Sequence, residues 1–256
     1  MTQTQALPGV RVLRGEVVVV FAVSLGASGV TALLSFLVAI TSTTALSSQR
    51  TSLVSSAAPG RPWLDLLCQL CFLALALAPV ALVAHLLTRS GESLRVLGLD
   101  RSQPRRDALR GAVLAALIGG SGLVLYLVAV ELGLNRTVVP SQLPDLWWRV
   151  PVEVLVSLQN AVLEEVLVLG YLLRRLEQMG WRPGRAVVVS ALLRGSYHLY
   201  QGLGGFIGNV AMGLLFGWLF LRWRRTVPFV VAHWVIDIVA LVGFTLLAGK
   251  VDWLPV

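Results

Sequence analysis

The residues best suited to chemistry are polar groups that interrupt long apolar stretches in the second half of the chain. Glu164 and Glu165 are adjacent in one stretch, His198 lies in the next, and His233 and Asp237 share the last. If these stretches cross a membrane, each ionisable group costs on the order of 3 kcal/mol by insertion scales, which marks it as a functional candidate. The pattern therefore predicts one polar site shared by several membrane helices.

Spacing within each helix supports a shared site. His233 and Asp237 are four residues apart, as are Arg194 and His198, so each pair occupies one helix face. His233 and Asp237 can present an imidazole and a carboxylate to one metal ion or one water molecule. Glu164 and Glu165 point about 100° apart around their helix, so only one of them can face the site squarely.

The composition requires a lipid environment for the helices that carry these groups. Hydrophobic residues make up 56% of the 256 residues and charged residues only 13%, against about 25% charged in a typical soluble domain. The net charge of +8 could attract nucleic acid, but the arginines lie in short segments between apolar runs. We therefore predict an integral membrane protein that contacts membrane lipid and binds no nucleic acid.

The apolar stretches predict an all-α, polytopic membrane helix bundle. A bilayer core about 30 Å thick needs roughly 20 residues of helix. Stretches that reach or approach this length give about seven expected transmembrane helices, at residues 17–40, 64–87, 111–131, 150–173, 186–203, 205–221 and 227–248. Alternate connecting segments carry fifteen Lys and Arg against five, so the positive-inside rule predicts a cytoplasmic N-terminus.

Depth along these expected helices brings the polar groups together. At a rise of about 1.5 Å per residue, the two glutamates, the two histidines and Asp237 lie roughly 9 to 18 Å from the cytoplasmic helix ends, in one layer. The sixth helix adds Asn209, which aligns with Gly213 and Gly217 at four-residue spacing. That stripe favours close helix packing, and a role for Asn209 in the site is the alternative.

The chain is expected to have two parts. Residues 1–149 would hold the N-terminal transmembrane helices and a cytoplasmic linker, and residues 150–248 a catalytic helix core. Residues 88–110 contain Gly91, Pro104 and many charges, which predicts a solvated linker with at most one short interfacial helix.

Three motifs in the second part resemble those of the CPBP family, which contains the CAAX prenyl endopeptidases. The family patterns are Glu-Glu-x-x-x-Arg, Phe-x-x-x-His and His-x-x-x-Asn/Asp. Here they read Glu164-Glu165-Val-Leu-Val-Leu169, Arg194-Gly-Ser-Tyr-His198 and His233-Trp-Val-Ile-Asp237. The resemblance covers about residues 150–240 and implies a CAAX prenyl endopeptidase-like core.

Two positions depart from the family patterns. Leu169 stands where the family has arginine, and Arg194 stands where it has phenylalanine. Because an unpaired buried charge is costly, we expect Arg194 to supply from the fifth helix the counter-charge that the fourth helix lacks, by pairing with Glu165. The alternative is a protein that kept the fold and lost the chemistry.

The resemblance implies hydrolysis of a peptide bond inside the membrane by an activated water. Glu164 would be the general base and Glu165 its orienter, with His198, His233 and Asp237 surrounding the water and Arg194 and Asn209 supporting them. The same histidines and Asp237 would suit a catalytic Zn²⁺ with an open position, or would orient water without a metal. The residues leave both open.

The expected substrate is a membrane-associated protein or peptide, and the composition is typical of a bacterial plasma-membrane protein. The sequence makes no prediction of oligomeric state. Two other functions remain as alternatives: a catalytically silent membrane adaptor or immunity-type protein on the same fold, and a proton-coupled transporter. The transporter is disfavoured because the chain has no internal repeat and its polar residues lie in one half.

Overall fold

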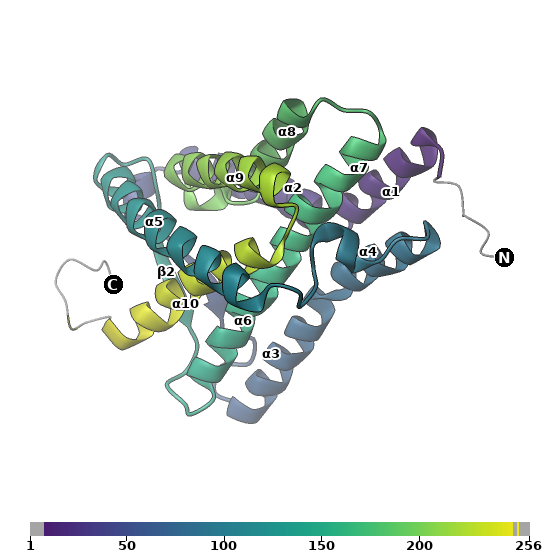
Figure 1. Ribbon diagram of the computed structural model, residues 1–256. Coiled ribbons are helices and arrows are strands. Elements are labelled where there is room, and N and C mark those ends of the chain that lie inside the picture. Colours follow the sequence, from purple (N-terminus) through teal and green to yellow (C-terminus); the bar gives the residue numbers. More distant parts are fainter. Residues whose placement is uncertain (1–7, 248–249, 251–256) are drawn as a thin grey trace.

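The structure is a computed structural model that describes residues 8–247 and 250. It confirms an all-α bundle, to which one pair of short strands is added (Figure 1). The elements, in order, are α1 (Val10–Ala22), α2 (Leu25–Ile40), η1 (Leu46–Ser48), β1 (Arg50–Ser55), α3 (Pro62–Ala76), α4 (Ala78–Arg89), η2 (Leu94–Leu97), α5 (Pro104–Glu131), β2 (Thr137–Gln142), α6 (Arg149–Glu164), η3 (Glu165–Tyr171), α7 (Leu172–Gln178), α8 (Pro183–Ser196), η4 (Leu199–Gln201), α9 (Leu203–Trp223) and α10 (Val227–Leu247).

The first expected helix, residues 17–40, is a bent pair. Helix α1 begins earlier than expected, and α1 and α2 meet at an angle of 49°. Gly26 permits this bend, because a Cβ there would lie 2.5 Å from the carbonyl oxygen of Phe21. The pair still counts as one candidate span, so the expected crossing stays a prediction, and the hydropathy did not reveal the break inside it.

The second expected helix, residues 64–87, corresponds to α3 and α4. Together they form a candidate span over Pro62–Arg89, with an interruption at Leu77. Pro79 explains the interruption, because its nitrogen carries no hydrogen for the helical ladder.

The expected solvated linker, residues 88–110, is folded against the protein. Helix α5 already begins at Pro104, and the backbone N–H of Thr226 donates to the carbonyl of Leu97 (3.1 Å). Arg225 donates through Nε to Asp107 (2.9 Å), and Asp107 is buried. The linker expectation was wrong in extent, because α5 takes up residues from 104 onward and two carboxylates, Asp100 and Asp107, pair with Arg225.

The fourth expected helix, residues 150–173, is continuous through α6, η3 and α7, although η3 is a π-helical segment. The fifth, residues 186–203, was wrong in length, because α8 ends at Ser196 and η4 follows. The sixth and seventh match α9 and α10; residue 248 lies outside the described residues.

Among the described residues, four helices or near-continuous helix pairs are long and apolar enough to cross a membrane, or five if α1 and α2 form one span. These findings support an integral membrane protein, while the expected count of seven is not confirmed. Helix α8 has 14 residues and is therefore about 21 Å long, shorter than a bilayer core.

A parallel pair of strands, which the sequence did not predict, joins two connecting segments. Strand β1 pairs with β2, with Arg50 opposite Thr137 and Ser55 opposite Gln142. Next to β2, Arg136 donates to the backbone oxygens of Tyr200 and Ser35. Arg136 therefore links η4 to the last turns of α2. His198 directly precedes η4.

The helices that carry the site pack around α6, η3 and α7, which run diagonally through the middle of the bundle (Figure 1). Helices α5 and α10 lie on one side of this axis, and α3 and α4 on the other. Helix α9 packs closely on α8, because Gly213 faces Ala191 and Gly217 faces Val187. This contact confirms the packing role expected of the small-residue stripe.

Candidate active site

Five of the predicted residues meet where α6 passes into η3. Glu164 ends α6 and Glu165 begins η3, while His198 follows the end of α8 and His233 and Asp237 lie on α10. The glutamates and His233 are buried, and the side chains of His198 and Asp237 are 17% and 25% exposed. The structure therefore gathers side chains from three parts of the chain into one partly accessible site.

Glu165 is the fixed carboxylate of the site. It is fully buried, and its Oε1 accepts a hydrogen bond from Arg194 Nη2 (2.5 Å) and another from His233 Nδ1 (2.8 Å). The structure thus confirms the predicted pairing of Arg194 with Glu165. Because a carboxylate only accepts, the His233 ring must carry a hydrogen on Nδ1.

Contacts from α8 and α9 hold this ion pair. The guanidinium of Arg194 lies 5.5 Å from the centre of the Phe216 ring, which favours a cation there. One turn earlier on α8, the hydroxyl of Ser190 donates to the carbonyl of Val168 in η3 (2.8 Å). Helix α8 is therefore joined to η3 by polar contacts at Glu165 and at Val168.

Glu164 has a different environment. Its Oε2 accepts a hydrogen bond from the hydroxyl of Tyr197 (2.8 Å) and lies 3.8 Å from Arg194 Nη1. Its Oε1 lies 3.7 Å from His198 Nε2, which has no hydrogen-bond partner among the described residues. The two atoms are too far apart for a direct hydrogen bond, and a water that contacts both would have to lie beside the pair.

The orientation of the His198 ring follows from Gln201. The Gln201 amide nitrogen lies 3.5 Å from His198 Nδ1, and because that amide only donates, Nδ1 must accept. In the neutral ring the hydrogen then lies on Nε2 and points toward Glu164. His198 can therefore donate a hydrogen bond to an oxygen atom in the site.

Asp237 lies next to the second histidine. Its Oδ1 is 3.5 Å from His233 Nε2, as their spacing on one helix face predicted. His233 thus has a carboxylate at each ring nitrogen, with Glu165 at Nδ1 and Asp237 at Nε2.

Asn209 stands apart from these contacts. Its amide donates to the carbonyl of Gly205 on its own helix (3.0 Å), which is the hydrogen bond that the structure shows for it. This position fits the expected packing role better than the alternative, a role in the site.

Two residues with evident roles were missed from the sequence. Tyr197 binds Glu164 directly, and Gln201 orients His198. The available signal was their proximity to His198, at one residue before it and three residues after it. Tyr197 occupies an unspecified position of the Phe-x-x-x-His motif and Gln201 lies outside it, so sequence reasoning selected neither residue.

The expected metal ligands are not gathered into one metal-binding group. No group of three or more His, Cys, Asp and Glu side chains is placed to hold a metal ion in the part of the chain that is described. His233 donates from Nδ1 to Glu165, which leaves its Nε2 for another partner, and Asp237 lies 3.5 Å from that Nε2. The expectation of Zn²⁺ therefore stays a prediction, and no step is derived through a metal.

Comparison with known proteins gives one family match, and it overlaps the site. No curated protein and no solved structure matches the chain. Residues 146–239, however, match the model of the family described as type II CAAX prenyl endopeptidase Rce1-like. This segment contains the candidate catalytic residues from Glu164 to Asp237, and the match supports a relationship to the CPBP, or CAAX protease, family.

Proposed function

We propose that the protein is an intramembrane endopeptidase that hydrolyses a peptide bond of a membrane-associated protein or peptide. The single observation that carries the proposal is the pair formed by Glu164 Oε1 and His198 Nε2, 3.7 Å apart in a partly accessible site. Glu164 Oε1 can accept a proton from water, and His198 Nε2 can donate a hydrogen bond.

The chemistry requires one water and these two groups. Glu164 takes a proton from the water, and the hydroxide oxygen bonds to the carbonyl carbon of the peptide. The Nε2–H of His198 donates to the oxyanion that forms. The proton then passes from Glu164 to the leaving nitrogen, the C–N bond breaks, and Glu164 returns to its carboxylate form.

Glu165 is unsuited to act as the base in this scheme. Its Oε1 already accepts from Arg194 and His233, and its Oε2 is buried. Its role is to hold Arg194 and His233 in place around Glu164. Asp237 is more exposed and belongs to the polar surroundings of the substrate and water.

The proposal also includes the location, the orientation and the substrate of the protein. The protein resides in a bacterial plasma membrane, with membrane lipid around it and the N-terminus in the cytoplasm, as the excess of arginine in alternate segments indicates. Its substrate is a peptide or protein segment that reaches the site from the membrane.

A silent adaptor on the same fold is favoured by one observation. Leu169 replaces the arginine of the family motif, and it is 2% exposed within the apolar core around η3. Against this, the counter-charge is present on α8, where Arg194 binds Glu165. An adaptor would need neither Tyr197 on Glu164 nor a free His198 Nε2.

The test is cleavage of a membrane-peptide library by purified protein in lipid nanodiscs, with metal analysis of the same sample. We expect Glu164→Ala to abolish cleavage, because no other described carboxylate faces His198 Nε2. The matched control is Glu153→Gln, which changes a buried glutamate of the same helix that binds Arg149 and Thr245. Equal cleavage by wild type and Glu164→Ala, in folded protein, would rule out the proposal.

A further inference from the structure

The seven residues of η3 connect the site to α7 through an uncommon helical form. π-helical turns are rare and occur mostly at functional sites. Glu164 and Glu165 lie at the start of this segment, and a shift of one residue in helical register corresponds to about 100° of rotation and about 1.5 Å of translation. The direction of both carboxylates therefore depends on contacts that hold η3 at both ends.

At its beginning, η3 is held by the site itself. Glu165 binds Arg194 of α8 and His233 of α10, and Ser190 of α8 donates to the carbonyl of Val168.

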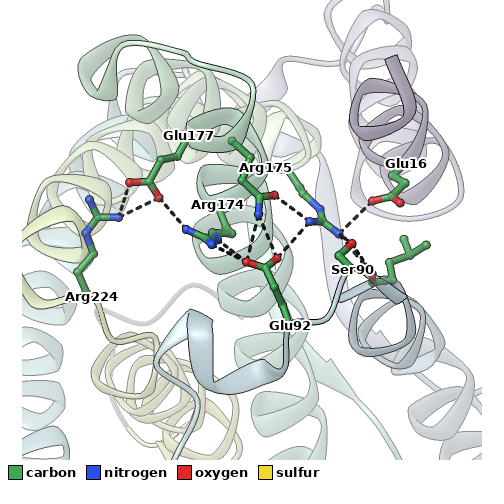
Figure 2. A network of polar contacts seen from close by, with 9 residues as sticks. Glu16, Ser90, Glu92, Arg174, Arg175, Glu177 and Arg224 are labelled. Carbon is green, nitrogen blue, oxygen red and sulfur yellow. Dashed lines mark hydrogen bonds and ion pairs between the residues drawn. The ribbon is translucent and has the colours of Figure 1, made fainter. Parts of the chain in front are cut away.

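At its end, η3 is held by a second buried arginine. Arg175 on α7 is fully buried, and its guanidinium lies 3.0 Å from Glu16 of α1 and 3.3 Å from Glu92 (Figure 2). It also donates to the hydroxyl of Ser90 (3.2 Å). The hydroxyl of Tyr171, the last residue of η3, reaches Glu16 as well (3.5 Å).

Glu92 is the common acceptor of this group, which we call the Glu92 network. It receives Arg174 Nε (3.1 Å) and the amide of Gln178 (3.1 Å) in addition to Arg175. Figure 2 shows Glu92 between these side chains of α7, with the pair of Glu177 and Arg224 at the edge. That pair is about half exposed, so it contributes little to holding α7.

We propose that Arg175 is a positioning residue for Glu164 and Glu165. By binding Glu92 and Glu16 it fixes the rotation of α7, and through η3 it keeps the two glutamates directed at α8 and α10. The expected effect of Arg175 on kcat rests on the proposed endopeptidase activity. Its expected effect on the hydrogen exchange of η3 does not.

The experiment compares full-length variants in nanodiscs by peptide cleavage and by hydrogen exchange of the amides of residues 165–171. Arg175→Met removes the guanidinium, Glu92→Gln removes only the charge of its acceptor, and Arg175→Lys restores the charge without the planar group. The matched control is Arg224→Gln, which removes an exposed arginine of the same network.

For Arg175→Met we expect faster exchange in residues 165–171 and a fall in kcat of about tenfold or more with little change in KM, since a displacement of 1 Å can cost about 100-fold. Glu92→Gln should act in the same direction, Arg175→Lys should recover part of kcat, and Arg224→Gln should resemble wild type. A merely structural arginine would lower the unfolding temperature but leave the kcat of the folded fraction unchanged.

The inference is overturned if Arg175→Met and Glu92→Gln keep wild-type exchange in residues 165–171, or if exchange rises while kcat stays at the wild-type value. Glu92→Gln decides the matter if Arg175→Met does not fold. If wild-type protein cleaves no peptide, the proposed function fails, and the exchange measurement alone decides whether Arg175 holds η3.

Discussion

At the scale of the residue, the site depends on where one positive charge is placed. Arg194 is buried beside two glutamates, and it binds the one that begins η3 while remaining 3.8 Å from the other. A guanidinium can serve two carboxylates because its donors are arranged in a planar fork. The position of this charge on α8, and not on the glutamate helix, is what distinguishes the chain from the family motifs.

The first prediction concerns Leu169 and Arg194, the two positions that depart from the family motifs. Arg194→Phe alone should lower the free energy of unfolding by about 3 to 5 kcal/mol, because it leaves the buried Glu165 without its counter-charge. Adding Leu169→Arg should restore folding and cleavage, since the guanidinium then comes from the glutamate helix. The measurements are thermal unfolding in detergent and peptide cleavage.

Arg185→Phe is the control for this exchange, because Arg185 is an exposed arginine of the same helix. It should leave both measurements close to wild type. If the single Arg194→Phe variant and the double variant behave alike, an arginine at position 169 does not replace Arg194 as the counter-charge of Glu165, and the prediction is wrong.

The second prediction concerns Tyr197. Tyr197→Phe removes the hydroxyl that donates to Glu164, and a hydrogen bond to a charged group contributes about 1.5 to 3 kcal/mol. We expect kcat to fall by about tenfold to 100-fold, as measured by peptide cleavage. Tyr126→Phe, which removes a hydroxyl that accepts from Val138, should not change kcat. A Tyr197→Phe variant with wild-type kcat would remove Tyr197 from the catalytic group.

At the scale of the element, hydropathy predicted the helices that are uniformly apolar and missed local breaks. Helices α9 and α10 match expectation because their apolar runs end at charged or turn residues. The break before Gly26 depends on a backbone contact, and the end of α8 falls inside an apolar run that continues past Ser196. A π-helical segment such as η3 uses the same residue types as an α-helix, so composition cannot distinguish them.

The site was more predictable than the helix boundaries. Intramembrane charges are few, and the cost of burial leaves them few possible partners, so the pairing of Arg194 with Glu165 followed from the sequence. Tyr197 and the Glu92 network did not, because polar residues near helix ends are common and only the packing of α7 against α1 shows which of them are buried.

The third prediction tests the contact between α8 and α9. A Cβ at Gly213 would lie 2.8 Å from the Cα of Ala191, so Gly213→Ala must push the helices apart. Overpacking of this kind costs about 1 to 3 kcal/mol, and it should lower the unfolding temperature in detergent. Gly120→Ala is the control, because a Cβ there meets no atom within 4 Å. A Gly213→Ala variant as stable as this control would contradict the close packing.

The fourth prediction concerns the folded linker before α5. The pKa of Asp100 is lowered from 3.8 to about 2, first by hydrogen bonds from the hydroxyl and the backbone N–H of Ser102 and then by Arg225. A lowered pKa means that this carboxylate stabilises the fold above pH 3.8 and that the contribution is lost as the pH falls toward about 2.

Thermal unfolding in detergent can measure this dependence. Asp100→Asn should unfold at a lower temperature than wild type at neutral pH, and the difference should shrink as the pH falls from about 4 to about 2. A difference that stays constant over this range would show that the carboxylate form of Asp100 does not stabilise the linker.

At the scale of the whole molecule, the connecting segments fall into two groups. The Glu92 network joins α1, the turn after α4, α7 and, through Arg224, the turn after α9. Another set of contacts joins the end of α2, the strands β1 and β2, and η4. Seven alternating crossings would place these groups on opposite sides of the membrane, although the number of crossings itself stays a prediction.

The last prediction tests this arrangement and its orientation. Arg105, at the start of α5, belongs with the arginine-rich segments, whereas Asp145 follows β2; both side chains are exposed. Because Lys and Arg concentrate on the cytoplasmic side, a cysteine at position 145 should react with a membrane-impermeant maleimide in intact cells, and a cysteine at 105 only after lysis. The variants are Asp145→Cys and Arg105→Cys in a chain whose Cys68 and Cys71 are replaced by serine. The opposite pattern would reverse the orientation, and reaction of both in intact cells would show that the two groups share one side of the membrane.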